Sequence, residues 1–147
     1  MSTRCLIGLK EKDNKVSYIY CHHDGDPLVA GKKLVEYYSG KRYLRDLLAL
    51  GDISSLGKYP LSTPGGWEDY DKVGDKCLAY RDRGEDVSAK TAESINDFLA
   101  VDCWQDYTYL FDPEDNKWYV FERGDKEENK KDLKGFLMEC GGYYEEE

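Results

Sequence analysis

The chain has 147 residues, with 30 acidic and 21 basic side chains, a formal net charge of −9 and an isoelectric point near 4.8. This charge argues against a general nucleic-acid binder, because such proteins need Lys and Arg to displace counterions. The length suits one domain, residues 1–147, that buries a core. No apolar run is long enough to span a membrane, and residues 1–5 lack the apolar stretch of a signal peptide, so we expect a cytoplasmic protein.

The first third of the chain predicts a β-hairpin and two helices. β-branched and aromatic residues in segments 6–9 and 16–20 flank a polar turn, a pattern typical of a hairpin. Asp26 and Pro27 suit the start of a helix, and apolar residues then recur at helical spacing to residue 38. A second helix around Leu44 and Leu47 should stop at Gly51.

Residues 53–74 show no sustained periodicity and are rich in Gly and Pro. We predict one capped helical turn over residues 52–57 and then a long ordered loop. Loops of this length inside a domain are usually functional or mobile. Trp67 and two tyrosines supply apolar mass, so the segment is not interpreted as a domain linker.

The remaining chain predicts a strand at 77–80, a short helix after Ser94, and a central hairpin formed by 107–111 and 117–121. Asp125 should open a last helix, whose apolar stripe is Leu133, Phe136, Leu137 and Cys140. Residues 143–147 should form a frayed acidic tail. The predicted fold is therefore α+β, in the order ββααβαββα. We expect an antiparallel sheet of about five strands with three to four helices packed on it.

The average charge hides two unlike parts. Residues 1–50 carry a net charge of +3 and residues 51–147 one of −12, with ten acids and two bases between positions 82 and 115. The plain interpretation is a solvated face. The sharper hypothesis is an acidic, Tyr-rich surface that binds a basic protein, because the chain has 13 Tyr and Tyr is enriched at interfaces. The candidate contact residues are Asp82, Glu85, Asp86, Asp106 and Trp67.

The five cysteines should be free thiols, because their number is odd and no secretion signal is evident. We expect Cys77, Cys103 and Cys140 in the core, since they lie in apolar stretches. Cys21-His22-His23-Asp24 is a weak metal candidate, which a hairpin placing Cys5 opposite Cys21 could complete. Adjacent side chains diverge on a strand, however, and metal ligands are usually spaced more widely. We expect no cofactor.

Other motifs are weaker still. The Arg81–Asp86 turn has carboxylates that could bind a divalent cation, although such a turn is more often simply solvated. The phosphate-loop, dinucleotide-binding, nucleophile-elbow and HExxH patterns are absent. Residues 32–45 are basic through Lys32, Lys33, Lys41, Arg42 and Arg45. We therefore expect no nucleic-acid binding except by local phosphate contact of this segment, despite the overall charge.

Three segments carry a resemblance: TRCLIG at 3–8, YIYCHHDGDP at 18–27 and LGDISSLG at 50–57. Together with 79–85 and 117–120, they resemble a group of small uncharacterised proteins from bacteriophages and bacterial mobile elements. That group has the pattern TRxxIG, YxYCHxDGxP, LGDISSLG, and commonly an aromatic residue where this chain has Asp26. The resemblance implies an origin in a bacterial host cell and no particular reaction.

Three functions remain open. The favoured hypothesis is a non-enzymatic phage-type protein that inhibits or adapts a host protein with a basic surface, including anti-defence (anti-CRISPR-like) inhibition. The first alternative is a metal-dependent hydrolase or nuclease centred on His22, His23 and Asp24. The second is a self-associating structural protein, such as a homodimer that pairs the +3 part with the −12 part.

Overall fold

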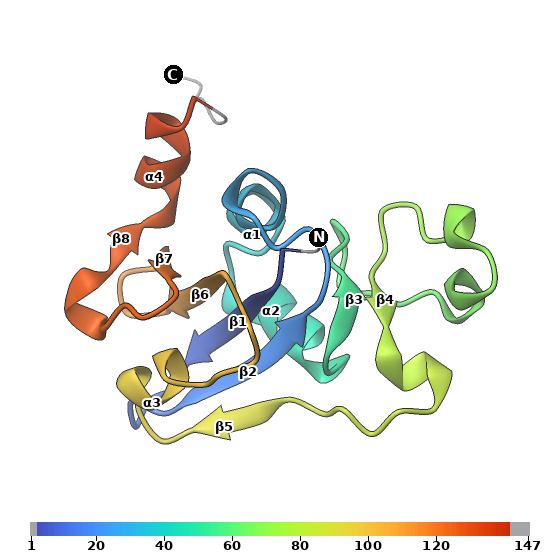
Figure 1. Ribbon diagram of the computed structural model, residues 1–147, viewed down its shortest axis with the longest axis horizontal. Helices are drawn as coiled ribbons and strands as arrows, with labels where there is room; N and C mark the ends of the chain where they lie inside the picture. The colour runs from blue at the N-terminus through green and yellow to red at the C-terminus, as the bar shows by residue number, and fades with distance from the viewer. Residues whose placement is uncertain (1–2, 142–147) are drawn as a thin grey trace.

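The computed structural model describes residues 3–141, and a mixed sheet of eight strands lies at its centre (Figure 1). The strands are β1 (Cys5–Lys10), β2 (Val16–Cys21), β3 (Ile53–Ser55), β4 (Leu78–Ala79), β5 (Lys90–Ala92), β6 (Tyr107–Asp112), β7 (Lys117–Glu122) and β8 (Lys131–Asp132). The helices are α1 (Lys32–Tyr37), α2 (Lys41–Ala49), α3 (Ile95–Leu99) and α4 (Leu133–Glu139). The α+β prediction is confirmed.

The prediction of about five antiparallel strands was wrong. The strand order is β4-β3-β2-β1-β6-β7-β8, with β5 beside β2, and the pairs β1–β6 and β2–β3 are parallel. The predicted element order lacks β3, β5 and β8, each of only two or three residues. Such short strands have too little alternation to stand out in a sequence, and pairing between distant strands has no local turn signal.

Both predicted hairpins are confirmed. β1 and β2 pair antiparallel with Cys5 opposite Cys21. β6 and β7 also pair antiparallel, with Tyr107 opposite Glu122 at one end and Asp112 opposite Lys117 at the other. Asn14 and Asn116 adopt positive φ in the two turns, a conformation that Asn tolerates better than most residues. β6 lies between β1 and β7, which agrees with the central position expected for the second hairpin.

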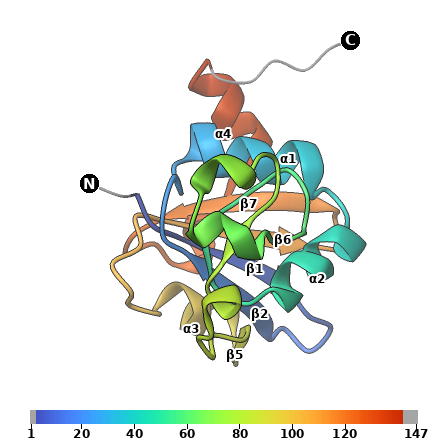
Figure 2. The same ribbon diagram turned by 90° about the vertical axis from the view of Figure 1, so that its right-hand side faces the viewer.

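The two faces of the sheet are covered unequally (Figure 2). One face packs against α1, α2 and α4, and the other against α3. β1 supplies both faces by alternation, because Ile7 and Leu9 enter the first core and Leu6 the second. Phe98 of α3 is fully buried and packs over Gly8, where a Cβ would lie 2.6 Å from its ring.

The helical prediction for residues 27–38 is confirmed with one refinement. The Asp26 carboxylate accepts the Leu28 N–H at 2.8 Å, and a π-helical turn over Pro27–Gly31 leads into α1. α2 ends just before Gly51, which has a φ of +76°. The Ser94 cap is also confirmed, because its hydroxyl accepts the Asp97 N–H at 3.0 Å.

The helical turn predicted for residues 52–57 is wrong. Residues 53–55 form β3, and the Asp52 carboxylate accepts the backbone N–H of Tyr20 at 2.9 Å instead of capping a helix. β2 therefore supplies, through the Tyr20 N–H, the donor that the first turn of a helix would have supplied to Asp52.

The last helix begins later than predicted. A 3-10 turn at Glu127–Asn129 and β8 come first, because residues 126–132 are all polar and leave α4 no apolar face before Leu133. Leu133 and Leu137 are buried, but Cys140 is exposed at the helix end, so its assignment to the core was wrong. The tail at 143–147 lies outside the described residues.

Across residues 3–141, no helix combines the length and the apolar character needed to cross a bilayer.

Candidate functional site

A lobe formed by residues 57–77 projects from the β3–β4 edge of the sheet (Figures 1 and 2). We call it the projecting lobe. Its two ends are joined, because the Gly57 N–H donates to Cys77 Sγ at 3.2 Å and the Cys77 N–H to the Leu61 carbonyl at 2.7 Å. Its base is attached to the helical layer, where the buried Tyr38 hydroxyl donates to the Gly57 carbonyl at 2.9 Å. Val73 and Gly66 are buried inside it, so the lobe is ordered by its own packing.

The projecting lobe exposes large apolar side chains. The exposed fractions are 51% for Tyr59, 56% for Leu61 and 62% for Tyr70. Tyr43 of α2 is 57% exposed and joins Tyr59 and Leu61 around a hollow of about 450 Å³, with Arg81 at its rim. Scattered apolar residues are normal on a surface, but a group on one ordered segment is typical of an interaction site.

Residues 68–72 around Tyr70 hold three acids and one base, Lys72, and so carry a net charge of −2. Glu68, Asp69 and Asp71 are all exposed, and Asp69 accepts the Asp71 N–H at 3.2 Å at the start of a 3-10 turn. An exposed aromatic ring beside three carboxylates is complementary to a basic surface with an apolar recess.

Trp67 lies at the base of the projecting lobe in an aromatic stack. Its ring is 5.3 Å from that of Tyr80, and the Arg83 guanidinium lies 4.3 Å from its centroid. The indole N–H donates to the Ala79 carbonyl at 2.8 Å, and Arg83 forms a 2.6 Å ion pair with Glu85. The stack joins the projecting lobe to the 80–85 segment.

The five predicted contact residues do not form one surface. Glu85 is paired within the chain, and Asp82 is 12% exposed, with one oxygen 3.7 Å from Arg81 and the other buried without a hydrogen-bond partner. Asp86 is exposed near them. Asp106 lies elsewhere, because it accepts the Arg4 backbone N–H at 3.3 Å and lines a different hollow beside α4. Sequence reasoning missed Tyr59, Leu61 and Tyr70, whose exposure depends on how the loop folds.

The histidine segment is divided by strand alternation. Cys21 is fully buried opposite Cys5, whereas His22 is half-buried and His23 exposed beyond the strand end. The His22 and His23 rings contact each other at 4.4 Å, and the Tyr20 hydroxyl lies 2.7 Å from His22 Nδ1. Within residues 3–141, no three His, Cys, Asp or Glu side chains are grouped so as to hold a metal ion.

The thiols of Cys5, Cys77 and Cys103 are poorly suited to nucleophilic chemistry. Burial raises the pKa of Cys77 to about 11, and a hydrogen bond to Cys21 together with burial raises that of Cys5 well above its usual range. Cys103 is half-buried and packs against the second core, and this burial raises the pKa of its thiol. Raised pKa values leave little thiolate at neutral pH.

Asp52 joins the segments that carry the sequence resemblance. Its Oδ1 accepts the Tyr20 N–H, and its Oδ2 lies 3.5 Å from Lys90 Nζ. Its backbone N–H donates to the Val87 carbonyl at 2.8 Å, and its carbonyl accepts the Tyr80 N–H at 3.3 Å. One residue thus joins the end of β2 to the segment that follows β4.

We expect Asp52→Ala to lower the free energy of unfolding by about 1–3 kcal/mol, because it leaves the Tyr20 N–H without its acceptor. Urea denaturation measures this change. Asp46→Ala, on the exposed face of α2, is the control and should stay within about 0.5 kcal/mol of the wild type. Equal losses in the two variants would contradict the role given to Asp52.

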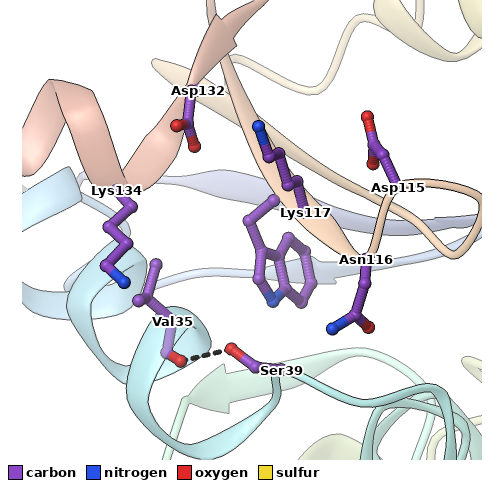
Figure 3. A pocket seen from close by; sticks show the side chains of 8 residues that line it. Val35, Ser39, Asp115, Asn116, Lys117, Asp132 and Lys134 are labelled. Carbon is purple, nitrogen blue, oxygen red and sulfur yellow. Dashed lines mark hydrogen bonds between the residues drawn. The ribbon is translucent and has the colours of Figure 1, made fainter.

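A third hollow, of about 390 Å³, lies between α1, the β6–β7 turn and the start of α4 (Figure 3). Trp118 and Val35 line it, and Asp115, Lys117, Asp132 and Lys134 surround it. The two acids and two bases around this hollow cancel in charge, so they favour neither an anionic nor a cationic ligand. We therefore assign no ligand to this hollow.

Comparisons with protein-family models, with curated proteins and with solved structures return no match for this chain.

Proposed function

We propose that this chain is a non-enzymatic, phage-type binding protein that occupies a basic surface of a host protein through its projecting lobe. The observation that carries the proposal is the group of exposed Tyr59, Leu61 and Tyr70 on a segment ordered by its own hydrogen bonds. An ordered binding segment loses less conformational entropy on association than a flexible one.

Charge supports the choice of a basic partner. The chain carries −9 overall, and the acids around Tyr70 place part of that charge beside an aromatic anchor. A basic partner would be steered by this field, which acts over a Debye length of about 8 Å at physiological ionic strength. Tyr70 would then supply the short-range apolar contact, which long-range electrostatic attraction does not provide.

The test is capture of bacterial proteins on immobilised protein at low salt. We expect the triple variant Tyr59→Ser, Leu61→Ser, Tyr70→Ser to lose a protein that the wild type retains. An interface tyrosine is commonly worth about 2 kcal/mol, so affinity should fall more than tenfold. Raising the salt concentration should weaken retention by the wild type.

The matched control removes the same number of exposed apolar groups elsewhere. Leu28→Ser, Val29→Ser, Met138→Ser changes side chains that are 47%, 36% and 45% exposed and lie outside the projecting lobe. This control should retain the partner. Retention of the same protein by the lobe variant, or failure of the wild type to retain any at low salt, would overturn the proposal. A dimer mass for the wild type that the lobe variant lacks would assign the lobe to self-association instead.

A further inference from the structure

The strand β5 lies at an open edge of the sheet, at the lower margin of both views (Figures 1 and 2). β2 pairs with β1 along one side and with β3 and β5 along its other side. Within residues 3–141, no strand pairs with the outer side of β5. A strand added there would extend the sheet on the side from which the projecting lobe extends.

The hydrogen bonds of the first hairpin show which backbone groups of β5 point outward. In an antiparallel pair, residues that exchange hydrogen bonds alternate with residues that do not. The Glu11 N–H donates to the Lys15 carbonyl at 2.7 Å, so by alternation every second residue of β2 from Ser17 bonds to β1. The even-numbered residues of β2 point their backbone groups the other way. Tyr20 agrees with this alternation, because its N–H donates to the Asp52 carboxylate at 2.9 Å.

The same alternation leaves the backbone groups of Thr91 on the outer side of β5. Lys90 and Ala92 lie opposite even-numbered residues of β2, which bond to β5. Thr91 lies opposite Ser17, which bonds to β1, so the Thr91 N–H and carbonyl point away from β2. Thr91 is exposed, and no turn or loop within residues 3–141 forms a backbone hydrogen bond with it. The edge therefore presents one donor and one acceptor, the groups that bind an added strand.

Of the usual protections of an edge strand, β5 has only its short length of three residues. Residues 85–93 contain no proline, and the pairing of β5 with β2 shows no register shift. The charge of Lys90 is offset within the chain, because its Nζ lies 3.5 Å from Asp52 Oδ2. The open side of β5 is thus not blocked by a bulge, a proline or an unpaired lysine.

The charge around β5 favours a basic strand. Residues 85–97 hold four acids and one base, a net charge of −3. Asp86 and Asp97 are exposed and form no ion pair with the residues that the structure describes. Basic side chains on an incoming strand would be attracted by these carboxylates. A second copy of this chain would bring the same acidic segment and would be repelled.

We propose that β5 accepts an extended, basic segment of a partner protein as an added strand, with the Thr91 backbone exchanging hydrogen bonds with it. The choice of a protein partner rests on the function proposed above, whereas the open edge does not. β5 and the projecting lobe lie on the same side of the sheet, so one partner reaches both. The strand contact fixes the orientation of the partner, and the exposed tyrosines of the lobe supply apolar contact.

Proline substitutions test the open edge without any partner. Thr91→Pro removes only the outward N–H, and an edge strand tolerates proline where that group faces solvent. Lys90→Pro removes an N–H that bonds to β2, so it should lower the urea midpoint clearly more than Thr91→Pro does. In the wild type, the Thr91 amide should exchange its hydrogen faster than those of Lys90 and Ala92. Equal losses in the two variants, or equal exchange, would overturn the outward assignment of Thr91.

An NMR titration with a defined peptide tests the occupant. We expect a short peptide of alternating Lys and Val to shift the amide signals of Thr91 and Ala92 and to slow exchange at Thr91. Thr91→Pro, followed at Ala92, should weaken this binding about tenfold or more, because it removes a hydrogen bond at the contact. Thr91→Val keeps the N–H and nearly the same shape and should bind as the wild type does. A peptide of alternating Glu and Val should bind at least about tenfold more weakly than the Lys–Val peptide.

Three results would overturn the proposal. They are unchanged signals with the Lys–Val peptide, equal binding of the two peptides, and undiminished binding by Thr91→Pro. A shift of the Thr91 signal with protein concentration alone would assign the edge to a second copy instead. The triple variant of the projecting lobe should bind the peptide as the wild type does, so this test and the capture experiment fail independently.

Discussion

Phe98→Ala is expected to lower the free energy of unfolding by about 3–5 kcal/mol, the usual cost of removing a fully buried aromatic ring. Phe98 is fully buried, and its ring lies 5.1 Å from that of Tyr18. It belongs to α3, a helix of five residues that is too short to be stable without packing. Loss of the ring should therefore uncover much of the second face of the sheet.

Urea denaturation measures this loss, and Phe136→Ala is the matched control. Phe136 is only partly buried at the edge of the first core, so its removal should cost clearly less. A further test uses Gly8→Ala, whose Cβ would lie 2.6 Å from the Phe98 ring and 2.8 Å from Val16. The change should cost less in the Phe98→Ala background than alone, because part of the overlap is gone. Losses that add would contradict this packing.

Gly51→Ala is expected to cost about 2–4 kcal/mol for two separate reasons. The residue has a φ of +76°, which is strained for any side chain, and a Cβ there would overlap the backbone carbonyl of Val87. That carbonyl also accepts the Asp52 N–H, so the 87–88 segment cannot move away without losing a hydrogen bond.

Two other glycines separate these causes in the same denaturation experiment. Gly74 has a φ of +56° but no atom near its Cβ position, so Gly74→Ala should show the backbone strain alone, about 1–2 kcal/mol. Gly40 has a φ of −162° and open space, so Gly40→Ala should be nearly neutral. A loss at Gly51 no greater than that at Gly74 would show that Val87 does not press on this site.

The candidate sites were predicted unevenly. Trp67, Asp82 and Glu85 were singled out for their composition, and the structure places them together but uses Arg81 and Arg83 to neutralise much of the charge. Asp106 shares the acidic stretch with them but lies beside Arg4. The sequence could not show that Asp106 lies apart from the other acids. A run of acidic residues does not indicate which of them come together in the folded chain.

The features that could be predicted from the sequence alone are those that depend on local interactions. Some features depend on residues within a few positions of one another, so the sequence pattern predicts them. These are the two hairpins, the Asp26 and Ser94 caps and the end of α2 before Gly51. The tertiary structure decided the parallel pairs β1–β6 and β2–β3, the strand at residues 53–55 and the exposure of Tyr59, Leu61 and Tyr70. These features depend on partners supplied by distant segments, and neither periodicity nor composition encodes which segments meet.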